Sequence, residues 1–446
     1  MKKRNIDFWP NLILIWVVLC VLLADRLTID VSSGGRGIVP ILILLTPLLA
    51  ALVGFLSRGM ALGFLKHLMF RMFWGPFLLL TFLLPLLGVL FTTYPTRTLF
   101  ASMQAIVVLS FVSLGYWLGR TASNPEILWN RYLPIAIIVQ FIYALGQHLS
   151  RTGSISSSFW NPFYEWDLSS QLAYGSEVVL GRSTGFYVSA NTLGFWGVIA
   201  VCASLYLITS RLRYVSLVAA LLTILISQSR GALVAVSVVL IAALIWQFVF
   251  VRRFRMQDLI LSAFTIVIVT GAGWLLIQQG FAEQSVVDRF AGGLSVVTQG
   301  STADQNLVGR FKFWSEALRL HSEYLLGTFG PPEYKLGTAI DNDWVRLLVQ
   351  GGIIYVLTFI LMLGAGISLL WREGEGRFIG ALSGAIALAG LTQTPLGYTP
   401  ILLYWFILGV VFSYGSYGRQ CRELRTFRSR KGSLLFVRLP RVRVVR

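Results

Sequence analysis

Runs of about 20 apolar residues recur along this 446-residue chain, and they limit its possible folds more than any other feature. A helix needs about 20 residues to cross the hydrocarbon core of a bilayer. Hydrophobic residues make up 56% of the sequence. The pattern therefore predicts an all-α integral membrane protein with about twelve transmembrane helices. The predicted spans are residues 8–24, 38–56, 72–91, 99–118, 132–149, 187–209, 214–227, 231–251, 259–277, 344–370, 378–391 and 400–414.

The same runs define the domain organisation. Its parts are residues 1–149 with the first five helices, a loop at 150–186, helices six to nine in 187–277, a larger loop at 278–343, the last three helices in 344–416, and a basic tail at 417–446.

The distribution of charge predicts the orientation. With both termini in the cytoplasm, the cytoplasmic segments hold 25 Lys and Arg residues and 6 acids, whereas the other side holds 12 basic residues and 13 acids. This asymmetry is what the positive-inside rule describes. The net charge of +18 therefore reflects topology, and we expect no nucleic-acid partner. The basic tail suits contact with anionic membrane lipids.

The second long loop contains a predicted helix over residues 306–325. Apolar residues recur there at helical spacing and form one stripe, Leu307, Phe311, Trp314, Leu318 and Leu325. Two placements remain open. The helix lies flat on the membrane surface, or it packs on the end of the helix bundle.

Several short motifs follow one another in the second half of the chain, each at a predicted outer edge. They are Arg182-Ser-Thr-Gly185, Ala190-Asn191-Thr-Leu-Gly194, Ser227-Gln-Ser-Arg230-Gly-Ala232, Gly309-Arg310-Phe-Lys-Phe-Trp314 and Asp341-Asn342-Asp343-Trp344. In addition, Arg319 stands ten residues before Gly330.

In this order the motifs resemble the O-antigen polymerase and ligase superfamily, over roughly residues 182–371. The resemblance implies a GT-C-like, multi-pass glycosyltransferase of the bacterial inner membrane, with its active site facing the periplasm. Its substrate would be an oligosaccharide linked to undecaprenyl diphosphate, and a chain-length regulator protein is a candidate partner. The ligases usually carry a histidine where this chain has Asp341, so the resemblance favours a polymerase over a ligase.

The chemistry of such a reaction agrees with the arginines in these motifs. A guanidinium stays protonated and offers paired donors to phosphate oxygens, so Arg182, Arg230 and Arg310 are candidates to hold the diphosphate and stabilise its departure. Arg230 and Arg310 are assigned catalytic roles and Arg182 a substrate-binding role. The alternative for each is an ordinary surface or interfacial charge.

A carboxylate is needed to accept the proton of the attacking hydroxyl, and Asp341 is the first candidate, with Asp343 second. Either aspartate instead caps the following helix in the alternative interpretation. Asn191, Asn342, Asp343, Trp314 and Arg319 are the remaining candidates for substrate binding.

We expect neither a metal nor another cofactor, because the three histidines are far apart in the sequence and show no metal-binding spacing. A twelve-span transporter or flippase is the alternative from a different functional class. The absence of evident repetition between the two halves of the chain weighs against it.

Overall fold

The computed structural model describes residues 8–25, 28–30, 38–91, 95–122, 124–151, 154–156, 182–187, 189–246, 305–336, 340–372 and 374–414. The elements of the first third of the chain are α1 (Phe8–Leu23), β1 (Thr28–Asp30), β2 (Ile38–Pro40), α2 (Ile41–Leu56), η1 (Met60–Lys66), η2 (Phe70–Trp74), α3 (Gly75–Gly88), α4 (Pro95–Thr121) and α5 (Pro125–Arg151). Those of the remainder are α8 (Ala190–Tyr206), α9 (Leu212–Ser227), α10 (Arg230–Trp246), α13 (Gln305–Glu323), α14 (Glu333–Leu336), α15 (Asp343–Ser368), η5 (Leu369–Trp371), α16 (Glu375–Ala389), η6 (Pro395–Gly397), η7 (Thr399–Ile401) and a last helix that ends at Tyr414.

The described chain is helical except for one short antiparallel hairpin of β1 and β2, in which Ile29 pairs with Val39. The hairpin joins α1 to α2, and the hydropathy pattern did not predict it. Four described helical segments are long and apolar enough to cross a membrane, or five if the bent pair of α2 and η1 is counted as one span. Shorter apolar helices coincide with further predicted spans. These helices fit a protein embedded in a membrane.

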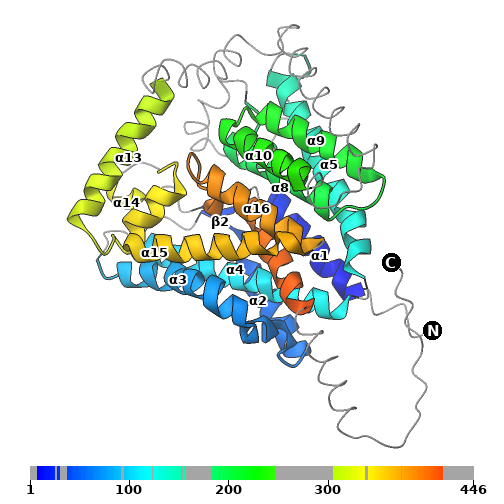
Figure 1. Ribbon diagram of the computed structural model, residues 1–446, viewed down its shortest axis with the longest axis horizontal. Coiled ribbons are helices and arrows are strands. Elements are labelled where there is room, and N and C mark those ends of the chain that lie inside the picture. Colours follow the sequence, from blue (N-terminus) through cyan, green and yellow to red (C-terminus); the bar gives the residue numbers. More distant parts are fainter. Residues whose placement is uncertain are drawn as a thin grey trace, which may run out of the picture.

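The last helix, Thr399–Tyr414, forms the centre of the packed bundle. Every residue from 400 to 413 is buried, as expected for a helix that is apolar on all sides. The hydroxyl of Tyr404 accepts a hydrogen bond from Trp74 Nε1 at 3.3 Å and lies 3.1 Å from Ser383 Oγ. In Figure 1, α15 extends beside α3 and α16, while α8, α9 and α10 lie above them, with α8 and α10 in contact with α16.

A break inside α15 fixes the position of the chain that follows α13. Gly352 has a φ of 66°, and the helix is interrupted there. Two carbonyl groups at the break are satisfied from outside the helix, because Thr328 N donates to Val349 O at 2.8 Å and Phe329 N donates to Gln350 O at 2.9 Å. The segment after α13 is thereby hydrogen-bonded to α15 at the break.

The helix predicted over residues 306–325 is present as α13 (Figure 1). It packs through Trp314, Ala317 and Leu320 against Ile340 and Val349. Three members of the predicted stripe, Phe311, Leu318 and Leu325, are exposed. The buried face is therefore rotated relative to the stripe, because α13 meets Ile340 and the first turns of α15 on one narrow side only.

Some predictions fall outside the described residues. They concern the span at 259–277, residues 157–181 and 278–304 of the two long loops, and the basic tail at 417–446.

Candidate functional site

The start of α15 is joined to the end of α16 by a set of hydrogen bonds. Asn342 is the N-cap of α15, and its side-chain oxygen accepts from Val345 N at 3.0 Å. Its Nδ2 donates to Leu391 O at 2.9 Å. The backbone N–H of Asp343 points to Gly390 O at 2.9 Å and Gln393 O at 3.2 Å. The segment 390–393 is thus fixed directly beside the Asp341-Asn342-Asp343 motif.

Arg310 reaches the same place from α13. Its Nη1 donates to Thr392 O at 2.9 Å, and its Nη2 lies 3.6 Å from the carboxylate of Asp341. The side chain of Arg310 is 25% exposed and that of Asp341 is 47% exposed. The ion pair is therefore accessible to a ligand, which would meet one cation and one carboxylate side by side.

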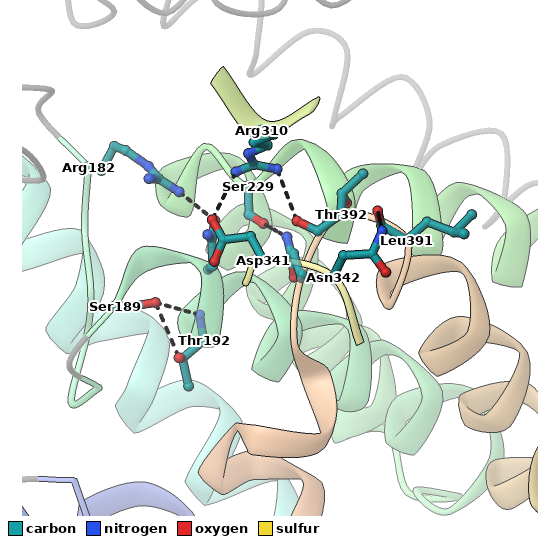
Figure 2. Close-up of polar contacts among 11 residues, drawn as sticks. Arg182, Ser189, Thr192, Ser229, Arg310, Asp341, Asn342, Leu391 and Thr392 are labelled. Carbon is teal, nitrogen blue, oxygen red and sulfur yellow. Dashed lines mark hydrogen bonds and ion pairs between the residues drawn. The ribbon is translucent and has the colours of Figure 1, made fainter. Parts of the chain in front are cut away.

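Arg182 approaches from the group formed by α8 and α9. Its side chain is only 4% exposed. Nε donates to Ser227 O at 3.1 Å, and Nη2 donates to Asn191 Oδ1 at 2.8 Å. Figure 2 shows the guanidinium groups of Arg182 and Arg310 pointing toward the region where Asp341 and Asn342 lie. Asn191, predicted to bind substrate, orients Arg182.

A hydrogen bond between two small polar side chains joins the two halves of the site. Gln393 Nε2 donates to Ser229 Oγ at 2.6 Å. Ser229 lies between the end of α9 and Arg230, which is half-buried at the first position of α10. Contacts therefore run without interruption from Arg182 through Ser227 and Ser229 to the segment 390–393, and from there to Arg310 and Asp341.

Two glycines allow these elements to approach so closely. A Cβ on Gly194 of α8 would lie 2.5 Å from Ser229 Cβ, and a Cβ on Gly231 of α10 would lie 2.6 Å from Gln393 Nε2. Both distances are too short for a side chain. The close packing at these two positions thus explains why the motifs carry glycine there.

The electrostatic field of the site favours an anion. Three helices, α8, α10 and α15, begin at the network, and a helix N-terminus carries a partial positive charge. Ser189 caps α8 by accepting from Thr192 N at 3.2 Å (Figure 2). With the guanidinium groups of Arg182 and Arg310, these ends provide donors suited to phosphate oxygens.

Asp343 has a different environment from its neighbour Asp341. It is fully buried, accepts from Leu396 N at 3.0 Å, and lies 3.8 Å from Arg346 Nη1. Arg346 also pairs with Glu333 at 3.1 Å. Asp343 is thus enclosed by protein groups, and its role in substrate binding stays a prediction.

The nearby Tyr398 is affected by the same carboxylates. Burial raises the pKa of its hydroxyl above the ordinary value, and the charges of Asp341 and Asp343 raise this pKa further. Tyr398 therefore remains a neutral hydrogen-bond donor beside the site.

Three more residues predicted to bind substrate, Asn342, Trp314 and Arg319, lie in described helices or at their ends. Capping of α15 belongs to Asn342 and to neither aspartate, so the suggested caps at Asp341 and Asp343 are wrong. Asn342 is 5% exposed and both of its side-chain hydrogen bonds are to backbone groups, and its role in substrate binding stays a prediction. Trp314 anchors α13, and Arg319 is exposed about 14 Å along α13 from Arg310, outside the network.

The sequence interpretation missed Thr392, Gln393 and Glu333. A signal for two of them existed, because Thr392-Gln393-Thr394-Pro395 is a polar interruption between two apolar runs. Within the part of the chain that the structure describes, no group of three His, Cys, Asp or Glu side chains is arranged to hold a metal ion.

Comparison of the chain with known protein families and with curated proteins gave no match.

Proposed function

We propose that this protein is a membrane glycosyltransferase that elongates a lipid-linked glycan. It would transfer a glycan from undecaprenyl diphosphate to the non-reducing end of a second lipid-linked repeat unit. The observation that carries the proposal is the convergence of Arg182, Arg310 and Asp341 through the segment 390–393. The order of motifs that resembles the O-antigen polymerases supports the same assignment.

The arginines suit the leaving group of this reaction. As the bond between the anomeric carbon and the diphosphate oxygen breaks, both bonding electrons stay on the diphosphate. Arg310 and Arg230 would stabilise that charge in the transition state, and Arg182 would hold the donor. Asn191 and Ser227 O fix the direction of the Arg182 side chain before any ligand arrives, which lowers the cost of reorganisation.

Asp341 suits the acceptor. Its carboxylate would take the proton from the acceptor hydroxyl while that oxygen bonds to the anomeric carbon. In this structure Asp341 pairs with Arg310. A bound diphosphate would compete for the Arg310 guanidinium and so leave the carboxylate to act as the base. Donor binding would then prepare the acceptor side of the site.

The membrane topology is part of the proposal. With about twelve spans and both termini in the cytoplasm, the site would face the periplasm of the inner membrane, where lipid-linked repeat units are joined. The accessible Arg310 and Asp341 pair would then lie near the outer leaflet, close to the diphosphate of its substrate.

The test is an elongation assay. Purified protein is given lipid-linked repeat units without added metal, and product length is measured by gel electrophoresis. Wild-type protein is expected to lengthen the glycan, and Arg230→Ala to lose about two orders of magnitude in rate, as for removal of one transition-state donor. Undiminished elongation by Arg230→Ala would remove the central assignment.

A parallel reaction separates polymerase from ligase. The same labelled donor is offered either a second repeat unit or a lipid A core acceptor. Transfer to lipid A core alone would make the protein a ligase. Movement of the lipid across vesicles without transfer would instead support a flippase.

A further inference from the structure

An apolar groove of about 390 Å³ lies between α1 and α2, away from the network of arginines. Its walls include Trp9, Leu12 and Leu19 of α1, Leu49 and Leu52 of α2, and Ser57 directly after α2. Ser57 is the one hydroxyl among the lining residues. The groove therefore suits hydrocarbon and offers almost nothing to a polar ligand.

The direction of the groove follows from the contacts between the two helices. Trp16 Nε1 donates to Thr46 Oγ1 at 3.1 Å, and Cys20 Sγ lies 3.8 Å from Leu42 O. These pairs show that α1 and α2 are antiparallel and are joined toward the end of α1. The lining residues extend from Leu19 back to Trp9 along α1 and from Leu49 to Ser57 on the other side, so the beginning of α1 and the end of α2 lie together at one end of the groove, its mouth.

The groove has the depth of one leaflet. From Trp9 to Leu19, α1 rises about 15 Å, which is half of the roughly 30 Å hydrocarbon core. Trp9, near the beginning of α1, lies at the mouth, and tryptophan is enriched at the level of lipid headgroups. A single acyl chain that starts at the mouth would therefore end near the middle of the bilayer.

A cation stands at the mouth. Arg58 follows Ser57 directly and is exposed, with a φ of 53° at the end of α2. The turn is closed by Gly59 N, which donates to Gly54 O at 2.7 Å. Among the described residues Arg58 has no carboxylate partner. Its charge is available to a phosphate group at the membrane surface.

We propose that this groove binds one acyl chain of an anionic phospholipid, with the headgroup beside Arg58. The predicted orientation puts Arg58 on the cytoplasmic side, so the lipid would come from the cytoplasmic leaflet. The site goes beyond the proposed glycosyl transfer and does not depend on it. The lipid would fill the space between α1 and α2 and hold these two helices against α4.

Native mass spectrometry of the full-length protein in detergent tests the site. The protein is titrated with phosphatidylglycerol or phosphatidylcholine, and retained lipid is counted. Wild-type protein is expected to retain one phosphatidylglycerol in preference to phosphatidylcholine. Leu52→Trp fills the groove and is expected to abolish retention. Leu357→Trp is the matched control, because Leu52 and Leu357 are both 50% exposed and Leu357 lies on α15.

A second variant tests the headgroup contact without changing the apolar walls of the groove. Arg58→Gln is expected to weaken phosphatidylglycerol binding about fivefold, whereas Arg319→Gln, at an exposed position on α13, is expected to have no effect. Equal retention by Leu52→Trp and Leu357→Trp, or by Arg58→Gln and wild type, would overturn the proposal. Displacement of phosphatidylglycerol by an equimolar polyprenyl phosphate would also overturn it, in favour of a site for the carrier lipid.

Discussion

Arg310 and Asp341 form an ion pair at 3.6 Å in which both side chains remain accessible. Arg310 comes from α13, and Asp341 immediately precedes the cap of α15, so 30 residues of sequence separate them. The carbonyl of Thr392 holds the other guanidinium nitrogen at 2.9 Å. The pair is thus positioned by three segments of the chain. This arrangement gives the most direct tests of the site.

Replacement of Arg310 is expected to reduce elongation strongly. Under the proposed function, Arg310→Ala removes a donor for the leaving diphosphate, and the expected loss in kcat/KM is about 10²- to 10³-fold. Arg310→Lys is expected to recover only part of it, because an ammonium cannot offer paired donors. Arg319→Ala, on the exposed side of the same helix, serves as the control and should stay within about twofold of wild type in the elongation assay.

Asp341→Asn is expected to lower kcat while leaving donor binding nearly unchanged. The amide keeps the shape of the side chain but cannot accept the proton, and the loss of a general base costs about 10²- to 10⁴-fold. Single-turnover kinetics with saturating donor measures this step. A normal rate with Asp341→Asn would show that another group is the base.

The two neighbouring aspartates are expected to respond in opposite ways. Asp343→Ala leaves the backbone N–H of Leu396 without its buried acceptor, while Glu333 still pairs with Arg346, and should destabilise the protein by about 1 to 3 kcal/mol. Asp341→Ala should keep the wild-type melting temperature, because its carboxylate is 47% exposed. Thermal unfolding in detergent compares the two, and a stable Asp343→Ala protein would contradict the assignment of Asp343 to the fold.

Asn342 is expected to be needed for stability through both of its side-chain contacts. Asn342→Ala loses the cap of α15, at about 1 kcal/mol, together with the hydrogen bond to Leu391 O. Asn342→Asp keeps an acceptor for Val345 N and should recover the cap alone. The difference in melting temperature between the two variants therefore isolates the cap, and identical values would exclude it.

Gly194→Ala is expected to impair folding at the site. The added Cβ would lie 2.5 Å from Ser229 Cβ, so α8 and α10 would have to separate. Gly309→Ala provides a matched control, because no atom lies within 4 Å of a Cβ at that position on α13. This control should be neutral or stabilising by up to about 1 kcal/mol. Melting temperature and elongation rate together measure both effects.

Most helices could be predicted from the sequence because their signal is local. Eleven of the predicted spans overlap described helices, and α13 follows from apolar spacing along a single segment. The buried face of α13 could not be predicted in this way. Val308, Phe311 and Leu318 are as apolar as Trp314 and Ala317, and the position of α15 alone decides which of them is covered.

The sequence by itself determined that apolar helices dominate this chain, and its motifs named Arg182, Arg310 and Asp341, since both kinds of information lie in short stretches of residues. Only the tertiary structure decided that Asp341 is accessible while Asp343 is buried, two positions away. It also brought Thr392 and Gln393, about 50 residues further along, to complete the site. The physical reason is that burial and hydrogen-bond partners depend on segments distant in sequence, here the end of α16 against the start of α15, which no local pattern records.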